Sequence, residues 1–241
     1  TFDDGPMKLP PNPINVDFKE QDSLTKLLVE IMDFYGAKGT FNVIGTTADN
    51  YPDRLGKINS PTWGGIKSDH YPKFDSDALG GVRNQPELVK LLIDHGHELS
   101  NHGYNHVLFG PNRLVYGRRH HLNSLYETSS ELNKLHNIVK NDFDIKMKFA
   151  RPAHYIDKIP DGFNAYDAYT LLEYHYLAAS FDGGGWMPTI GDYSLDIDKM
   201  VKPLERTLLE NPNSLNGQII FQKDGYNMSM MTPVAHGLKK H

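Results

Sequence analysis

The sequence has no cysteine, no long apolar run and no excess of positive charge. The lack of cysteine excludes disulfide bonds, thiolate catalysis and cysteine-ligated metal sites. No apolar stretch approaches the roughly 20 residues that a helix needs to cross a bilayer, and no signal peptide is visible. The formal net charge of -5 argues against nucleic acid or an anionic membrane as the main partner.

What the sequence does contain is typical of a globular protein that can bury a sizeable core. Its 241 residues are 39% hydrophobic and 23% charged. Helical and strand patterns alternate about six times along the chain. Helices are expected in residues 21–39, 84–96, 122–141, 164–175 and 196–211, and strands in residues 40–45, 97–103, 147–153, 176–182 and 217–224. This alternation predicts an α/β fold with a mostly parallel sheet, and we expect one domain over residues 1–241.

Polar and ionisable residues follow several of the apolar strands. They are Asp3 and Asp4, the region of His102, Arg151, Asp182, and Lys223 with Asp224. In α/β domains, binding and catalytic groups collect at the carboxyl ends of the strands. We therefore expect these residues to surround one site.

The spacing of His102 and His106 suggests a metal site. On a helix or in a tight turn, residues four apart share a face, so both imidazoles can reach one ion. Two histidines and one carboxylate leave coordination positions for water and substrate, and Asp3 or Asp4 is the natural carboxylate. Alone, the histidine pair would more simply be a surface feature, but its combination with "TFDDGP" favours the metal site. The other histidines, His95 and His97 among them, are expected to be loop and turn residues.

In the order in which they occur, the motifs resemble those of the polysaccharide deacetylases of carbohydrate esterase family 4, the NodB-homology domain. "TFDDGP" resembles the first motif, "HGHELSNHGYNH" the second, "RPAHY" the third and "FDGGGW" the fourth, while "IIFQKDG" stands in the place of the fifth. The resemblance covers nearly the whole chain. It implies a distorted, incomplete (β/α) barrel of about seven parallel strands, and it leads us to expect a sequence truncated at both ends.

The resemblance also implies a reaction, which is metal-dependent hydrolysis of acetyl groups on a glycan. N-acetyl groups are expected rather than O-acetyl groups. Asp4, His102 and His106 would hold a divalent ion, for which zinc is expected and Co²⁺, Mn²⁺ or Ni²⁺ are alternatives. Asp3 would act as the general base. Two neighbouring carboxylates on one strand end would point in different directions, which allows one to be a ligand and the other a base.

The remaining roles come from the later motifs. Arg151 would fix Asp3, although a surface ion pair is the simpler alternative. The backbone N–H of His154 would stabilise the oxyanion, and Tyr155, Asp182 and Trp186 would contact the substrate. For Trp186, a place in the core is an equally ordinary explanation.

Three departures from the family's pattern concern these later motifs. Gly185 stands where the family has an aspartate that orients the arginine, so Asp182 is a possible substitute. Lys223 stands where the family has a histidine that acts as the general acid, and Ala153-His154 replaces Pro-Tyr. These changes leave two alternatives open. One is a catalytically impaired, metal-loaded glycan-binding protein, and the other is a hydrolase of non-sugar amides on the same fold.

The polar stretch over residues 51–81 is expected to be an insertion loop. Its aromatic residues either stack on sugar rings or anchor the loop to the body. The expected partner is an acetylated glycan. By family resemblance, the expected location is extracellular or in the cell envelope.

Overall fold

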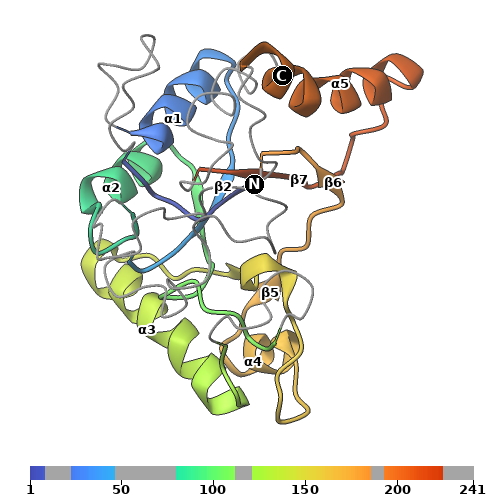
Figure 1. The fold of residues 1–241 in the computed structure, drawn as a ribbon. Helices are drawn as coiled ribbons and strands as arrows, with labels where there is room; N and C mark the ends of the chain where they lie inside the picture. Colours follow the sequence, from blue (N-terminus) through green and yellow to red (C-terminus); the bar gives the residue numbers. More distant parts are fainter. Residues whose placement is uncertain (9–22, 47–79, 112–120, 186–192, 225–241) are drawn as a thin grey trace.

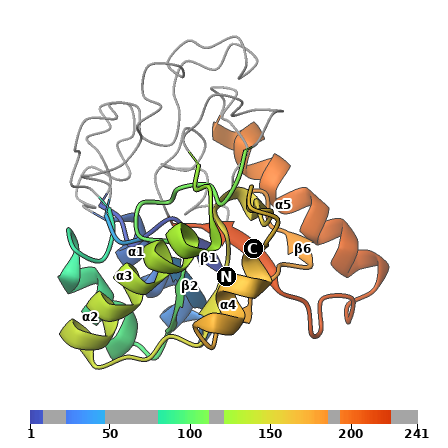
Figure 2. The same cartoon turned by 90° about the horizontal axis from the view of Figure 1, so that it is seen from below.

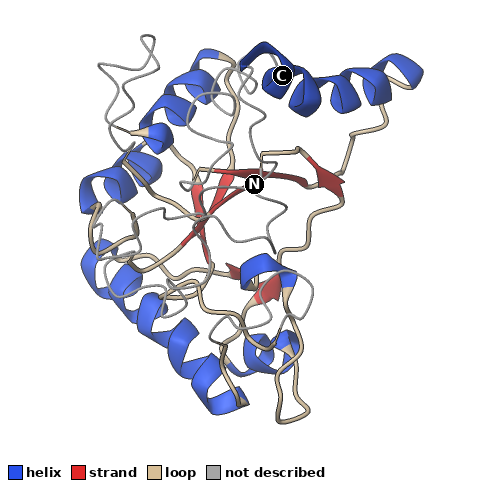
Figure 3. Cartoon of the chain, viewed as in Figure 1, coloured by secondary structure: helices blue, strands red, loops and turns tan. Residues whose placement is uncertain are grey.

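The computed structural model describes residues 1–8, 23–46, 80–111, 121–185 and 193–224. Within them, seven parallel strands form one sheet with the order β5-β4-β3-β2-β1-β7-β6. The strands are β1 (Phe2–Asp3), β2 (Thr40–Val43), β3 (Glu98–Asn101), β4 (Phe149–Ala150), β5 (His175–Tyr176), β6 (Phe181–Asp182) and β7 (Ile220–Lys223). The strands lie at the centre and the helices surround them (Figure 3). This arrangement is the predicted distorted, incomplete (β/α) barrel.

Five α-helices are described, and each overlaps a stretch with helical spacing in the sequence. They are α1 (Leu24–Phe34), α2 (Pro86–Asp94), α3 (Leu125–Phe143), α4 (Ala165–Leu171) and α5 (Tyr193–Glu210). Side chains cap three of their starts: Ser23 and Ser124 accept hydrogen bonds from the first turns of α1 and α3, and Asn164 forms a capping box on α4. The two views place α5 on the opposite flank of the molecule from α2 and α3 (Figures 1 and 2).

The stretch over residues 176–182, which the sequence suggested was one strand, is divided in two. Tyr176 ends β5 at one edge of the sheet, and Phe181 begins β6 at the other edge. A chain of this length spans at most about 17 Å, so the two edges of the sheet must approach each other. The sheet is therefore curled, and its concave side encloses a small interior.

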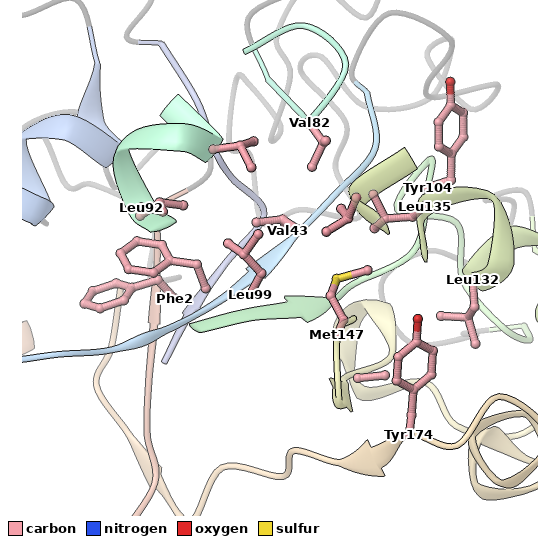
Figure 4. Packing of buried hydrophobic residues seen from close by; sticks show 14 of the residues in the cluster. Phe2, Val43, Val82, Leu92, Leu99, Tyr104, Leu132, Leu135, Met147 and Tyr174 are labelled. Atoms are coloured by element: carbon pink, nitrogen blue, oxygen red, sulfur yellow. The ribbon is translucent and has the colours of Figure 1, made fainter. Parts of the chain in front are cut away.

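The core lies between the sheet and the helices around it. Phe2 from β1 stacks on Phe41 from β2 with ring centroids 4.8 Å apart, and Figure 4 shows Phe2 close to Leu92 of α2 and Leu99 of β3. All four are buried, which fixes β1 in the middle of the sheet. The site at the end of β1 therefore rests on a packed base.

Residues 47–79, which include most of the predicted insertion, lie outside the described residues. The chain on either side of them is close together, because Val82 N–H donates to the Ile44 carbonyl at 2.9 Å and Gly81 N–H donates to the Pro6 carbonyl at 2.9 Å. Gly81 has φ +96°, and a Cβ there would lie 2.5 Å from the Gly45 carbonyl oxygen. The predicted loop thus leaves and re-enters the described part at neighbouring points, next to the end of β1. No helix among the described residues has the length and apolarity needed to cross a membrane.

Candidate active site

Asp3 and Asp4 are both buried, and their side chains converge. Asp3 ends β1, whereas Asp4 has φ +81°, a left-handed backbone conformation that is uncommon for residues other than glycine. This conformation breaks the alternation of side chains along the strand. His102 Nε2 consequently lies 3.2 Å from Asp4 Oδ1 and 3.6 Å from Asp3 Oδ2. The expectation that the two carboxylates point in different directions therefore needs correction, since both reach one imidazole and differ instead in their other partners.

The two histidines lie in a tight turn that follows β3, not in a helix. Gly103 and His106 in this turn have φ values of +87° and +54°. The Asn101 side chain accepts a hydrogen bond from Gly103 N–H at 2.9 Å, and the buried Glu131 carboxylate of α3 accepts one from Asn105 N–H. These two contacts hold the turn in a conformation that would otherwise be costly.

The sequence reasoning did not identify Asn101 or Glu131 as site residues. Asn101 could have been noticed, because a buried asparagine at the end of an apolar strand requires hydrogen-bond partners. The same signal marks Asn42 in "TFNVIG", which is opposite Asp3 in the sheet and donates to Asp3 Oδ1 at 2.7 Å. No comparable signal distinguishes Glu131 from the other polar residues of α3.

Asp4, His102 and His106 bring three potential ligand atoms within 4.8 Å of one another, and all three residues are buried. Asp4 Oδ1 lies 3.2 Å from His102 Nε2 and 3.0 Å from His106 Nε2. The other ring nitrogen of His102, Nδ1, is 2.8 Å from the Arg151 carbonyl oxygen. That contact requires the proton on Nδ1 and leaves the Nε2 lone pair directed toward Asp4. Two imidazole nitrogens and one carboxylate oxygen form a donor set that suits a divalent ion such as zinc.

Arg151 lies between β4 and β1, with its side chain fully buried. Its NH1 donates to Asp3 Oδ1 at 2.6 Å and to Thr1 Oγ1 at 3.0 Å, and its Nε donates to the Leu177 carbonyl at 2.7 Å. The predicted contact with Asp3 is therefore present, and it is a buried ion pair, not a surface one. Arg151 binds His102 through its backbone and Asp3 through its side chain.

Lys223 ends β7 next to Asp3 and is buried as well. Its Nζ donates to Asp4 Oδ2, the oxygen not shared with the imidazoles. Burial by itself would raise the pKa of Asp4, but Lys223 and the two histidines outweigh it and hold this pKa well below its ordinary value. Asp4 therefore carries a negative charge in the folded protein.

Asp224 follows Lys223 and lies beneath the site. Its carboxylate accepts hydrogen bonds from Gly5 N–H at 3.0 Å and Thr25 Oγ1 at 2.9 Å. A Cβ at Gly5 would lie only 2.1 Å from Asp224 Oδ2, so the glycine of "TFDDGP" makes room for this carboxylate. Burial raises the pKa of Asp224 to about 8, and the hydrogen bond from Thr25 opposes this shift.

His154 and Tyr155 lie in a short 3-10 turn after β4, and both have positive φ values. The His154 ring centroid is 5.1 Å from that of His106, so the third motif directly borders the candidate metal site. The Tyr155 ring packs against Phe221 and lies 5.3 Å from the Arg151 guanidinium, while part of it remains exposed.

The fourth motif is arranged around Gln222. A Cβ at Gly185 would lie 2.2 Å from Gln222 Oε1, and Gln222 Nε2 donates to the Gly183 carbonyl at 2.6 Å. The Gln222 side chain thus fills the space that a larger residue at position 185 would need. Asp182 is exposed on β6 and accepts a hydrogen bond from Gly184 N–H at 2.8 Å. Trp186 lies outside the described residues. The histidines expected outside the site are outside it, with His97 buried and accepting a hydrogen bond from Gly39 N–H at 3.1 Å.

Comparison with known proteins gives a consistent result. The model of the polysaccharide deacetylase family matches residues 1–177, while no curated protein matches the sequence. Among solved structures, the peptidoglycan deacetylase PdaC from Bacillus subtilis is 18% identical with a TM-score of 0.54, over 99% of this chain and 79% of that one. The polysaccharide deacetylase Bc1974 from Bacillus cereus is 16% identical with a TM-score of 0.56, over 99% and 83%.

A further similar structure is described as a pseudoenzyme. It is BA3943 from Bacillus anthracis, of carbohydrate esterase family 4, which is 14% identical with a TM-score of 0.52, over 90% of this chain and 55% of that one. At these identities the structural matches support the fold and not a particular activity.

Proposed function

Since the chain belongs to the polysaccharide deacetylase family, we propose that it is a metal-dependent hydrolase that removes acetyl groups from a polysaccharide or cell-wall glycan. N-acetyl groups are the favoured substrate over O-acetyl groups. The observation that carries the proposal is the convergence of Asp3, Asp4, His102 and His106 in one buried cluster. By family resemblance, the acetylated glycan would be met outside the cell or in the cell envelope.

Asp4, His102 and His106 would hold the divalent ion, for which zinc is the first choice and Co²⁺, Mn²⁺ and Ni²⁺ are alternatives. Such an ion polarises an acyl oxygen and lowers the pKa of water from 15.7 towards about 7. Asp3 would take the proton from the attacking water. Both described hydrogen bonds of Asp3, from Asn42 and Arg151, reach Oδ1, and Oδ2 faces His102. We therefore assign the base function to Oδ2.

The other residues would position the substrate and complete the proton transfers. The backbone N–H of His154 would donate to the developing oxyanion, which its place beside His106 supports. Lys223 would protonate the leaving group, in the position where the family has histidine. Tyr155 would contact the sugar with its exposed edge, and Asp182 and Trp186 would contribute to the substrate groove.

Acetate release tests this proposal. The protein is stripped with a chelator, reloaded with zinc, and assayed on acetylated chitooligosaccharide, peptidoglycan and xylan. We expect release only with metal, and a loss of 100- to 10,000-fold for Asp3→Asn, the typical range for a general base. Asp94→Asn, an exposed helix residue paired with Lys90, is the matched control and should keep full activity. No release from any substrate with any of the four metals would rule the proposal out.

A second candidate function is binding of a glycan without turnover. It is favoured by the ion pair of Lys223 with Asp4 and by the glycine at position 185, since both changes affect residues that the reaction would need. This candidate predicts glycan binding that survives Asp3→Asn, with no acetate release from the unaltered protein. If acetate release from linear or cyclic amides exceeded that from glycans, the substrate class would instead be non-sugar amides.

A further inference from the structure

The two oxygens of Asp4 face different partners. Oδ1 lies 3.0 Å from His106 Nε2 and 3.2 Å from His102 Nε2. Oδ2 accepts a hydrogen bond from Lys223 Nζ, which comes from the end of β7, 219 residues away in the sequence. One carboxylate thus divides its oxygens between a candidate metal site and a fixed ammonium group.

The charges of the buried residues around this point also pair one to one. Arg151 contacts Asp3, and Lys223 contacts Asp4, with side-chain exposures between 0% and 8% in both pairs. Unpaired buried charges are strongly unfavourable, so a cation beside Asp4 stabilises the folded chain before any metal binds. A divalent ion at Asp4, His102 and His106 would then enter a site whose anionic ligand already has a cationic partner.

We propose that Lys223 is a built-in counter-ion of the metal site: it holds Asp4 Oδ2, keeps Oδ1 with the two imidazoles, and weakens the binding of divalent metal. The inference rests on the proposed metal site, and it assigns Lys223 a positioning and charge-balancing role in addition to the one proposed above. The metal-free protein is accordingly a stable, charge-balanced state, and metal occupancy depends on the metal concentration around the protein.

The physical reason for weaker binding is repulsion between the ammonium and the ion. Two like charges at the same carboxylate are a few ångströms apart, and their repulsion is large in a buried site because little water screens it. A neutral side chain at position 223 would remove this repulsion but would leave Asp4 without its partner in the metal-free protein. Removing Lys223 should therefore have opposite effects on metal binding and on the stability of the metal-free protein.

This opposition separates the proposal from a purely structural role. If Lys223 only supported the fold, its loss would lower stability and would leave metal affinity equal or weaker. If it acts as a counter-ion, Lys223→Met lowers the melting temperature of the metal-free protein and tightens metal binding. Lys223→Arg keeps the charge, so its metal affinity should stay near that of the unaltered protein.

The experiment measures Zn²⁺ and Co²⁺ dissociation constants by competition with a chromophoric chelator, together with melting temperatures with and without metal. We expect Lys223→Met to bind metal at least about tenfold more tightly, and to show a larger increase in melting temperature on metal addition. Lys223→Gln is a second neutral variant, which keeps the test valid if the methionine variant does not fold. Lys90→Met, which removes an exposed lysine paired with Asp94, is the control and should leave metal affinity unchanged.

Equal or weaker metal binding by both neutral variants would overturn this inference while leaving the proposed metal site intact. By contrast, if the unaltered protein and all variants fail to bind either metal, the proposed metal site itself is wrong. The absorption spectrum of bound Co²⁺ gives a further readout, because it reports whether the same ligands are used in each variant.

Discussion

The half of the site built from β1, β3 and β4 differs in construction from the half built from β6 and β7. In the first half, which we call the ligand half, Asp3, Asp4, His102, His106 and Arg151 contact one another directly. In the second half, which we call the β6–β7 half, Gly185 leaves space that Gln222 fills, and Lys223 is the residue that reaches the other half. The family's motifs are complete in the first half and altered in the second.

The difference shows how a site can change without losing its centre. The ligand half depends on a network in which Arg151 supports both His102 and Asp3, so a change at one residue disturbs the others. In the β6–β7 half, a glycine and a glutamine have adjusted to each other locally. Substrate contacts and proton donation would depend on this second half, and they can diverge while the metal and base groups stay in place.

The largest effect on stability is expected for Arg151→Met. The substitution keeps much of the apolar volume but leaves the buried carboxylate of Asp3 without its cation. Breaking a buried ion pair in this way typically costs about 3–5 kcal/mol, so urea unfolding should show a loss of this size in the free energy of unfolding. Arg206→Met, at an exposed position on α5, is the control. A loss below about 1 kcal/mol would show that the ligand half does not depend on Arg151.

The pH dependence of stability should differ between the two halves. Because burial raises the pKa of Asp224 to about 8 from the ordinary value of 3.8, the folded state retains a proton that the unfolded chain releases. The contribution of Asp224 to stability is therefore fully present below about pH 4 and is lost as the pH rises to about 8. The lowered pKa of Asp4 has the opposite sign, and its contribution is lost as the pH falls below 3.8.

Urea unfolding of the metal-free protein and of Asp224→Asn between pH 5 and 8 measures the first effect. The asparagine does not titrate, so the stability of the variant relative to the unaltered protein should rise across this range by a few kcal/mol. Parallel curves for the two proteins would show that Asp224 is ionised in the folded state throughout.

The smallest effect is expected for Gly185→Ala. Its Cβ would lie 2.2 Å from Gln222 Oε1, and displacing the Gln222 side chain should cost about 1–2 kcal/mol. In a Gln222→Ala background the same substitution should cost less, because the space is then free. A double-mutant cycle of unfolding free energies measures this coupling, and a coupling energy near zero would contradict the assignment of Gln222 as the space-filling partner.

The sequence predicted most of the elements because each has a local signal. The helices α1 and α3 follow the spacing of their apolar residues and begin at serine caps, and the strands follow apolar runs. The prediction failed at residues 176–182, where one apolar stretch supplies two edge strands. Local pattern cannot distinguish one strand from two, because the separation depends on which neighbours each half pairs with.

By itself, the sequence determined the α/β barrel and the residue types of the ligand half, since the types and order of Asp3, Asp4, His102 and His106 already indicate metal-assisted hydrolysis. Only the tertiary structure decided how these residues meet. The left-handed backbone of Asp4 turns both carboxylates toward His102, Glu131 and Asn101 hold the histidine turn, and Lys223 reaches Asp4 from the far end of the chain. These contacts join residues up to 219 positions apart, so they exist only once the sheet has curled and brought its strand ends together.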